Sequence, residues 1–141
     1  MLKGLLILLF VFNISNLLAQ EIDDPSVEYL WIEDSINNRK VCLNPEVKPI
    51  FYDSALTFFK FFIDNFNYPS IECFQHKVII SFIVETNGDI TNKKILNDLV
   101  CDIHKEVIMV LDSLPKMKPG MIQGKSVPVR LTYPIMIAFK D

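Results

Sequence analysis

The sequence predicts an α+β fold: a three-stranded antiparallel sheet with two helices packed on one face and the last strand at an open edge. Three observations lead to this prediction. Every odd position of residues 127–139 is apolar, which is the period of a strand with one buried face. Residues 78–85 carry apolar side chains at both parities, which favours a central strand. Residues 55–66 and 103–114 have apolar positions at helical spacing, and two helices on one face of the sheet bury all of these stripes.

Length and composition indicate one domain behind a signal sequence. With 141 residues and 50% hydrophobic content, the chain forms one modest core. Residues 1–20 contain Lys3, an apolar run over 4–12 and the small residue Ala19, which is the pattern of a cleavable secretory signal. The run is shorter than the roughly 20 apolar residues that cross a membrane. We therefore expect cleavage near Gln20, and a retained membrane anchor is the alternative.

Residues 21–44 form a leader with the least readable pattern, ahead of a domain over residues 45–141. Residues 27–33 are rich in strand formers and are followed by the turn-like pair Asn37-Asn38. This order predicts a short strand or a hairpin in the leader.

The first helix is predicted over residues 55–66. Asp53 or Ser54 is expected to cap it, because an Asp or Ser side chain accepts a hydrogen bond from the first free amides of a helix. Tyr68-Pro69 ends the segment, since a residue before proline is disfavoured in helical conformation. Its many phenylalanines are more typical of a core than of a ligand site.

A hairpin is predicted after the central strand. The pair Asn87-Gly88 tolerates positive φ and favours a tight turn. The returning strand, residues 90–96, is polar and carries Lys93 and Lys94, which places it at an edge of the sheet. Its apolar positions are out of phase, which predicts a bulge near Thr91-Asn92.

The second helix, with Asp102 as its expected cap, ends before Pro115 and leads to the last strand. Pro128 and Pro134 both occupy even positions of that strand and have no N–H to donate. Backbone groups alternate between the two edges of a strand. The odd-numbered residues are therefore expected to pair with a neighbour, and the even-numbered edge is expected to stay open.

Several function classes are disfavoured by composition and motifs. The formal net charge is −3, and no dense cluster of lysine and arginine is present, which argues against binding of nucleic acid. His76 and His104 fall on different elements, so no metal site and no cofactor are expected. The sequence contains no phosphate-binding loop, nucleophile elbow or catalytic carboxylate pair, which argues against an enzyme.

Cys42, Cys73 and Cys101 are the three cysteines of the chain. In an oxidising compartment they allow one disulfide and one free thiol, although buried inert thiols are the more common case. If a pair forms within the domain, it is expected between Cys73 and Cys101, because Cys42 lies in the leader.

A set of motifs near the carboxyl end has a recognisable order. It consists of Leu-Pro-Lys-x-Lys-Pro-Gly over residues 114–120, Gly-Lys-x-Val-x-Val over residues 124–129 and Tyr-Pro-Ile over residues 133–135. Upstream, Asn-Tyr-Pro at 67–69 and Asn-Gly-Asp-Ile at 87–90 complete the set, together with the Cys-Asp pair that precedes the second helix. This order resembles the TonB C-terminal domain family over residues 45–139. The chain lacks the proline-rich spacer of full-length members, and Met117 stands where the family usually has tryptophan.

The resemblance implies a periplasmic module that binds the N-terminal box of TonB-dependent outer-membrane receptors by strand addition, in the service of energised transport. The partner-binding positions that it implies are Arg130, Thr132, Met136, Ala138, Lys116 and Lys118. Inner-membrane energising proteins would be further partners of an anchored form. The alternative is a secreted structural domain with no transport role that forms a homodimer through its open strand edge.

Overall fold

The computed structural model describes residues 27–68, 76–99 and 103–138. Its main feature is a mixed five-stranded sheet of order β1-β2-β9-β4-β5. The strands are β1 (Trp31–Asp34), β2 (Arg39–Cys42), β4 (His76–Val84), β5 (Ile90–Ile95) and β9 (Val129–Ile137). The prediction of a three-stranded antiparallel sheet with the last strand at its edge is therefore wrong. β4 lies between β9 and β5 as an inner strand, and β5 lies at an edge, as predicted, but the middle strand of the sheet is β9.

The additional strands come from the segment assigned to the leader. β1 and β2 form an antiparallel hairpin whose turn places Asn38 at φ 48°. β2 then runs parallel to β9 and pairs with it at one position, Cys42 with Val129. The amide of Cys42 donates to the carbonyl of Pro128 at 2.9 Å. Because β2 occupies this first position, β9 is an inner strand at its beginning.

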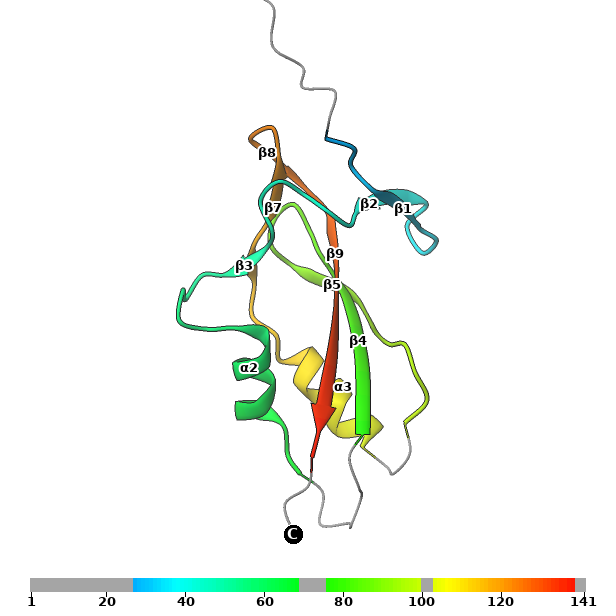
Figure 1. Cartoon of the computed structure of the whole chain (residues 1–141), viewed down its shortest axis with the longest axis vertical. Helices are drawn as coiled ribbons and strands as arrows, with labels where there is room; N and C mark the ends of the chain where they lie inside the picture. The colour runs from blue at the N-terminus through cyan, green and yellow to red at the C-terminus, as the bar shows by residue number, and fades with distance from the viewer. Residues whose placement is uncertain (1–26, 69–75, 100–102, 139–141) are drawn as a thin grey trace, which may run out of the picture.

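β4 and β9 are antiparallel neighbours from His76–Ile137 to Val84–Val129, and they run side by side along the molecule (Figure 1). Pro134 lies opposite Ile79. The amide and carbonyl of Ile79 bond to residues on the other side, to Asn97 Oδ1 at 2.7 Å and to Leu96 at 2.8 Å. Pro134 therefore sits at a non-hydrogen-bonded position of the β4–β9 ladder, where no N–H is needed. The predicted parity, with odd residues of β9 paired inward, is confirmed.

The described residues contain two helices, α2 (Phe58–Asn65) and α3 (His104–Asp112). Thr57 caps α2 by accepting from the amide of Lys60 at 3.2 Å, so the prediction of Asp53 or Ser54 as cap is wrong. Asp53 instead accepts from the amide of Ala55 in the preceding turn, at 2.9 Å. α3 has Ile103 at its cap position, and Asp102 lies outside the described residues.

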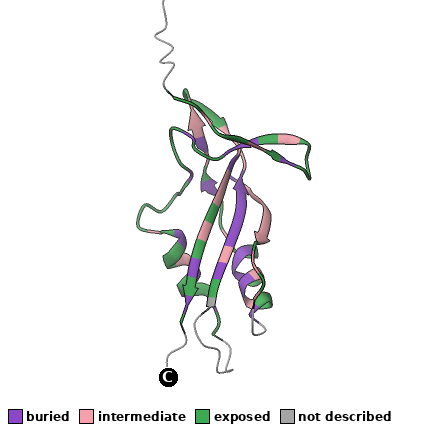
Figure 2. Ribbon diagram, turned by 45° about the vertical axis from the view of Figure 1, so that its right-hand side comes forward, coloured by how far each residue is buried: buried purple, intermediate pink, exposed green. Residues whose placement is uncertain are grey.

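Both helices pack on the same face of the sheet. Buried positions follow one another along β4 and alternate with exposed ones towards the end of β9 (Figure 2). The buried cluster joins aromatic and aliphatic side chains of the helices to alternate residues of the two long strands. Its main members are Phe58, Phe62, Phe66, Val107, Val110, Leu111, Val78, Ile80, Phe82, Val84, Ile135 and Ile137.

Two small antiparallel pairs extend the fold. β3 (Ile50–Phe51) pairs with β6 (Met117–Lys118), and β7 (Gly120–Ile122) pairs with β8 (Lys125–Val127). In Figure 1 the β7–β8 pair and the β1–β2 hairpin lie towards one end of the molecule, and both helices lie towards the other.

The β4–β5 hairpin has a loop of Thr86, Asn87 and Gly88, closed by the Glu85 amide on the Asp89 carbonyl at 2.8 Å. Gly88 adopts φ 88°. Its carbonyl accepts from the amide of Met117 at 3.0 Å, which fixes the loop against β6.

The predicted bulge in the β4–β5 ladder is confirmed. The pairing register shifts between Ser81 and Ile83, so that Asn92 and Lys93 lie opposite one residue of β4. Asn92 adopts φ 48° at this point.

Candidate protein-binding edge

The outer edge of β9 is paired with β2 at Val129 and has no described strand beside it farther along. β2 pairs with β9 at Val129 alone, and no other described strand pairs with this edge up to Ile137. The even-numbered backbone groups of β9 point to this side, as the bond from Cys42 to the Pro128 carbonyl demonstrates. Thr132 and Met136 therefore direct an amide and a carbonyl outward, and Pro134 directs a carbonyl only. The amide of Arg130 belongs to the parallel bridge between Cys42 and Val129, so Arg130 offers only its carbonyl. We call residues 130–138 the free edge.

α2 flanks the free edge on the helix side of the sheet. The ring of Phe58 stacks on Tyr133 with centroids 4.2 Å apart, and Phe59 meets the same ring edge-on at 5.9 Å. Phe59 is 48% exposed and Ile63 is 59% exposed. These two residues are one helical turn apart and share a face. We call them the α2 ridge. The expectation that all apolar positions of residues 55–66 are buried is wrong at these two residues.

The four strand residues of the predicted site occupy even positions on the outward side, with Pro134 between Thr132 and Met136 and with Ala138 just past the end of β9. Thr132, Met136 and Ala138 are exposed, and Met136 keeps 61% of its surface in solvent. Arg130 is half-buried opposite the fully buried Ile83. Its Nε is buried and has no hydrogen-bond partner among the described residues.

The two lysines of the predicted site have surroundings of their own. Lys116 Nζ lies 3.1 Å from the Asp89 carboxylate, beside the β4–β5 loop. Lys118 belongs to β6, and its ammonium lies 5.8 Å from the ring centre of Tyr52. Lys116 therefore contacts the β4–β5 loop, and Lys118 contacts Tyr52, the residue that follows β3. Neither of these contacts is with β9.

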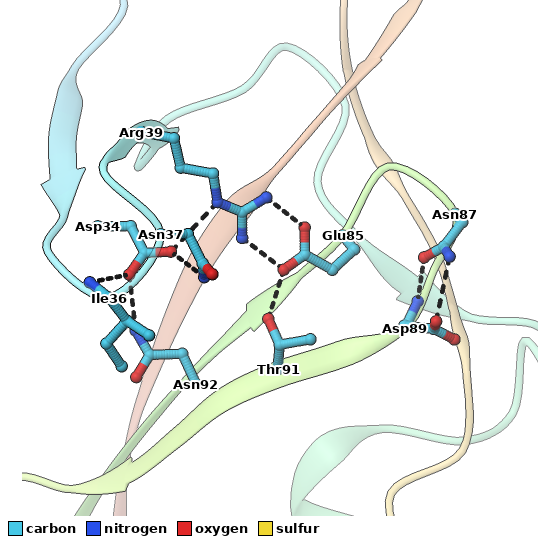
Figure 3. Close-up of polar contacts among 9 residues, drawn as sticks. All are labelled: Asp34, Ile36, Asn37, Arg39, Glu85, Asn87, Asp89, Thr91 and Asn92. Carbon is cyan, nitrogen blue, oxygen red and sulfur yellow. Dashed lines mark hydrogen bonds and ion pairs between the residues drawn. The ribbon is translucent and has the colours of Figure 1, made fainter.

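A second polar feature, which the sequence did not reveal, fixes the β1–β2 hairpin to the β4–β5 hairpin (Figure 3). Asp34 is fully buried and accepts hydrogen bonds from Asn37 at 2.9 Å and from Arg39 Nε at 3.2 Å. It also accepts from Asn92 Nδ2 at 3.2 Å. We call Asp34, Arg39, Glu85 and Asn92 the hairpin latch.

The arginine of the latch spans the two hairpins. Arg39 Nη1 lies 2.7 Å from Glu85 Oε2, and Nη2 lies 2.5 Å from Oε1. Thr91 donates a further hydrogen bond to the same carboxylate. One signal for this contact was available in the sequence. Asp34 and Arg39 have opposite charges and lie on either side of the turn, and in the structure they are cross-strand partners.

The latch lowers the pKa of both carboxyl groups. The hydrogen bond from Asn37 is the main reason why the pKa of Asp34 lies below its ordinary value, and Arg39 adds to it against the opposing effect of burial. The hydrogen bonds from Arg39 likewise hold the pKa of Glu85 below its usual range, with Thr91 contributing. Both groups are therefore carboxylates at neutral pH.

The backbone leaves β9 immediately after β2. The amide of Leu43 donates to the Leu30 carbonyl at 2.8 Å, and Asn44 Oδ1 accepts from the Leu30 amide at 2.5 Å. Nearby, the Tyr29 hydroxyl donates to Glu46, and this bond raises the pKa of Tyr29 to about 12. This segment therefore pairs with the chain ahead of β1 and not with the free edge.

Cys42 is a buried free thiol at the end of β2. Cys73 and Cys101 lie outside the described residues, so their pairing stays a prediction. Within residues 27–68, 76–99 and 103–138, no three His, Cys, Asp or Glu side chains gather closely enough to hold a metal ion.

Comparison of the sequence with protein-family models and with curated proteins gives no match. The resemblance to the TonB C-terminal domain family therefore stays a prediction. In the part of the chain that the structure describes, no helix has the length and hydropathy of a membrane span.

Proposed function

We propose that this chain is a protein-interaction module that binds an extended segment of a partner protein by strand addition at the free edge. The observation that supports this most is the set of outward backbone groups at Thr132, Pro134 and Met136, which no described strand pairs with, beside the exposed α2 ridge. Exposed strand edges are templates for pairing with another chain. The proposal assigns the chain no catalytic role.

The edge and the ridge supply two kinds of binding energy. Each main-chain hydrogen bond contributes about 1 kcal/mol net, and preference comes from the side chains of the added strand. Alternate side chains of that strand fall on the helix side of the sheet, where Phe59 and Ile63 offer apolar surface. We therefore expect partner segments with apolar residues at every second position.

The identity of the partner rests on the resemblance. We propose the N-terminal box of a TonB-dependent outer-membrane receptor, met in the periplasm, and a role in energised transport. If residues 1–20 stay attached as an anchor, inner-membrane energising proteins are further partners. Support comes from the order of the motifs over residues 114–135.

Peptide binding to two matched variants tests the proposal. Labelled peptides that cover receptor N-terminal boxes are titrated into the mature chain by fluorescence anisotropy. Ile63→Lys places a charge on the α2 ridge and is expected to weaken binding at least about fivefold, the equivalent of one hydrogen bond. Met109→Lys is the control, because Met109 is a 50% exposed apolar residue of the other helix.

Three outcomes distinguish peptide binding at the free edge from its alternatives. Loss of binding in Ile63→Lys alone supports the proposed edge. Equal effects in both variants contradict it. A tight dimer in sedimentation, with no affinity for any receptor peptide, favours the homodimer that pairs through the same edge.

A further inference from the structure

The β1–β2 hairpin occupies one end of the β9 edge. Cys42 pairs with Val129, and its amide holds the Pro128 carbonyl at 2.9 Å. After Cys42 the chain turns away, since the amide of Leu43 bonds to Leu30. The bridge at Val129 uses the Pro128 carbonyl and the Arg130 amide, so the outer side of β9 becomes free from the Arg130 carbonyl onward.

The hairpin is held in this position from two sides. Two hydrogen bonds join Arg39 to the Glu85 carboxylate, and paired contacts of this kind are among the stronger polar contacts in proteins. The buried Asp34 is bonded to Asn92 on β5. An incoming strand that displaced β2 would have to break these contacts in exchange for one or two main-chain bonds.

We propose that the hairpin is a register stop for the added strand, an inference that rests on the proposed function. The partner strand ends opposite Arg130 and pairs only with residues 130–138, at about 3.3 Å of strand per residue. Residues that extend a partner past Arg130 gain no main-chain bonds. The hairpin therefore selects partners whose extended segment is short or turns away at this point.

Peptides of graded length test the stop on the full mature chain. The probe is the tightest peptide recovered by panning a random-peptide phage library. A nitroxide spin label is attached to one peptide end at a time. The end whose label broadens the NMR signal of the Arg130 amide is the end that lies beside the hairpin. Thr-Val pairs are then added at that end, and Kd is measured for each length.

In the native chain these additions are expected to change Kd by less than about twofold. In a latch variant, Arg39→Ala with Glu85→Ala, the same additions are expected to tighten binding about fivefold for each new hydrogen bond. The control removes a different ion pair, Lys93 with Asp112 at 3.5 Å, and is expected to behave like the native chain.

A measurement on the native chain keeps the test independent of the variants' folding. The amide of Cys42 is expected to stay protected from hydrogen exchange in complexes of every length. Loss of that protection, or a steady gain in affinity past Arg130, overturns the stop. If the amides of Thr132 and Met136 are protected in such a complex, the proposed function survives that failure. If no peptide protects them, both proposals fail.

Discussion

Arg39 holds the carboxylate of Glu85 through both of its terminal nitrogens, at 2.7 and 2.5 Å. The contact joins the first hairpin of the described chain to the end of β4. Neither hairpin has a backbone hydrogen bond to the other among those that the structure describes, so side chains carry this connection.

Replacing the arginine is expected to destabilise the fold. Arg39→Ala leaves the carboxylates of Asp34 and Glu85 without their cation, and hydrogen bonds to charged groups contribute about 1.5–3 kcal/mol. We expect a loss of roughly 2 kcal/mol in the free energy of unfolding, measured by urea denaturation. Lys40→Ala, on the exposed face of the same strand, is expected to change it by less than about 0.5 kcal/mol. Equal losses in the two variants would show that the latch does not stabilise the fold.

The latch also makes stability depend on pH. The pKa values of Asp34 and Glu85 are lower in the folded chain than in the unfolded chain. Their stabilising contribution is therefore complete above about pH 5.5, where the unfolded groups are almost fully ionised, and is lost as the pH falls from there through the folded values. Urea midpoints of the native chain and of Arg39→Ala should converge between neutral and acidic pH. A constant difference would be inconsistent with this linkage.

Proline substitutions at neighbouring positions test which edge of β9 is paired. Thr132→Pro removes an outward amide and is expected to cost little stability while it abolishes peptide binding. Leu131 lies opposite Phe82, and its amide points to β4, so Leu131→Pro breaks a ladder bond. That variant should lose roughly 3 kcal/mol or more in a thermal melt. The reverse ranking would place the paired edge on the other side.

Two glycines with positive φ give a matched comparison. A Cβ on Gly88 would lie 2.2 Å from the Met117 carbonyl oxygen, whereas a Cβ on Gly124 would meet nothing within 4 Å. Gly124→Ala is expected to cost about 1 kcal/mol, from backbone conformation alone. Gly88→Ala should cost at least about 1 kcal/mol more, because the β4–β5 loop must move off β6. Equal unfolding free energies would mean that this loop contact is unimportant.

Local sequence pattern was sufficient to predict the two long strands of the sheet and the hairpin between β4 and β5. The parity of Pro128 and Pro134, the inner place of β4 and the bulge at Asn92 all follow from period, proline chemistry and phase. These features depend on residues close together in sequence, which explains why they were predictable.

Features set by distant contacts were not predictable in this way. The place of β2 depends on one pairing with Val129 and on side-chain bonds to Glu85, and neither leaves a periodic signal. The helix start was placed too early, at Asp53 or Ser54. Asp53 accepts a hydrogen bond from Ala55 within a turn, and Thr57 caps the helix. Periodicity likewise could not show that Phe59, although it contacts Tyr133, stays about half exposed.

The pairing of β2 and β4 with β9 also constrains the order of folding. The ribosome delivers β2 and β4 long before it delivers β9, which lies between them in the sheet. Until residues 129–137 emerge, Cys42 has no strand to join and β4 lacks its longest neighbour. Closing such long loops is slow, since chain entropy is lost before the contacts form. The five-stranded sheet therefore cannot be completed until the last strand has been synthesised.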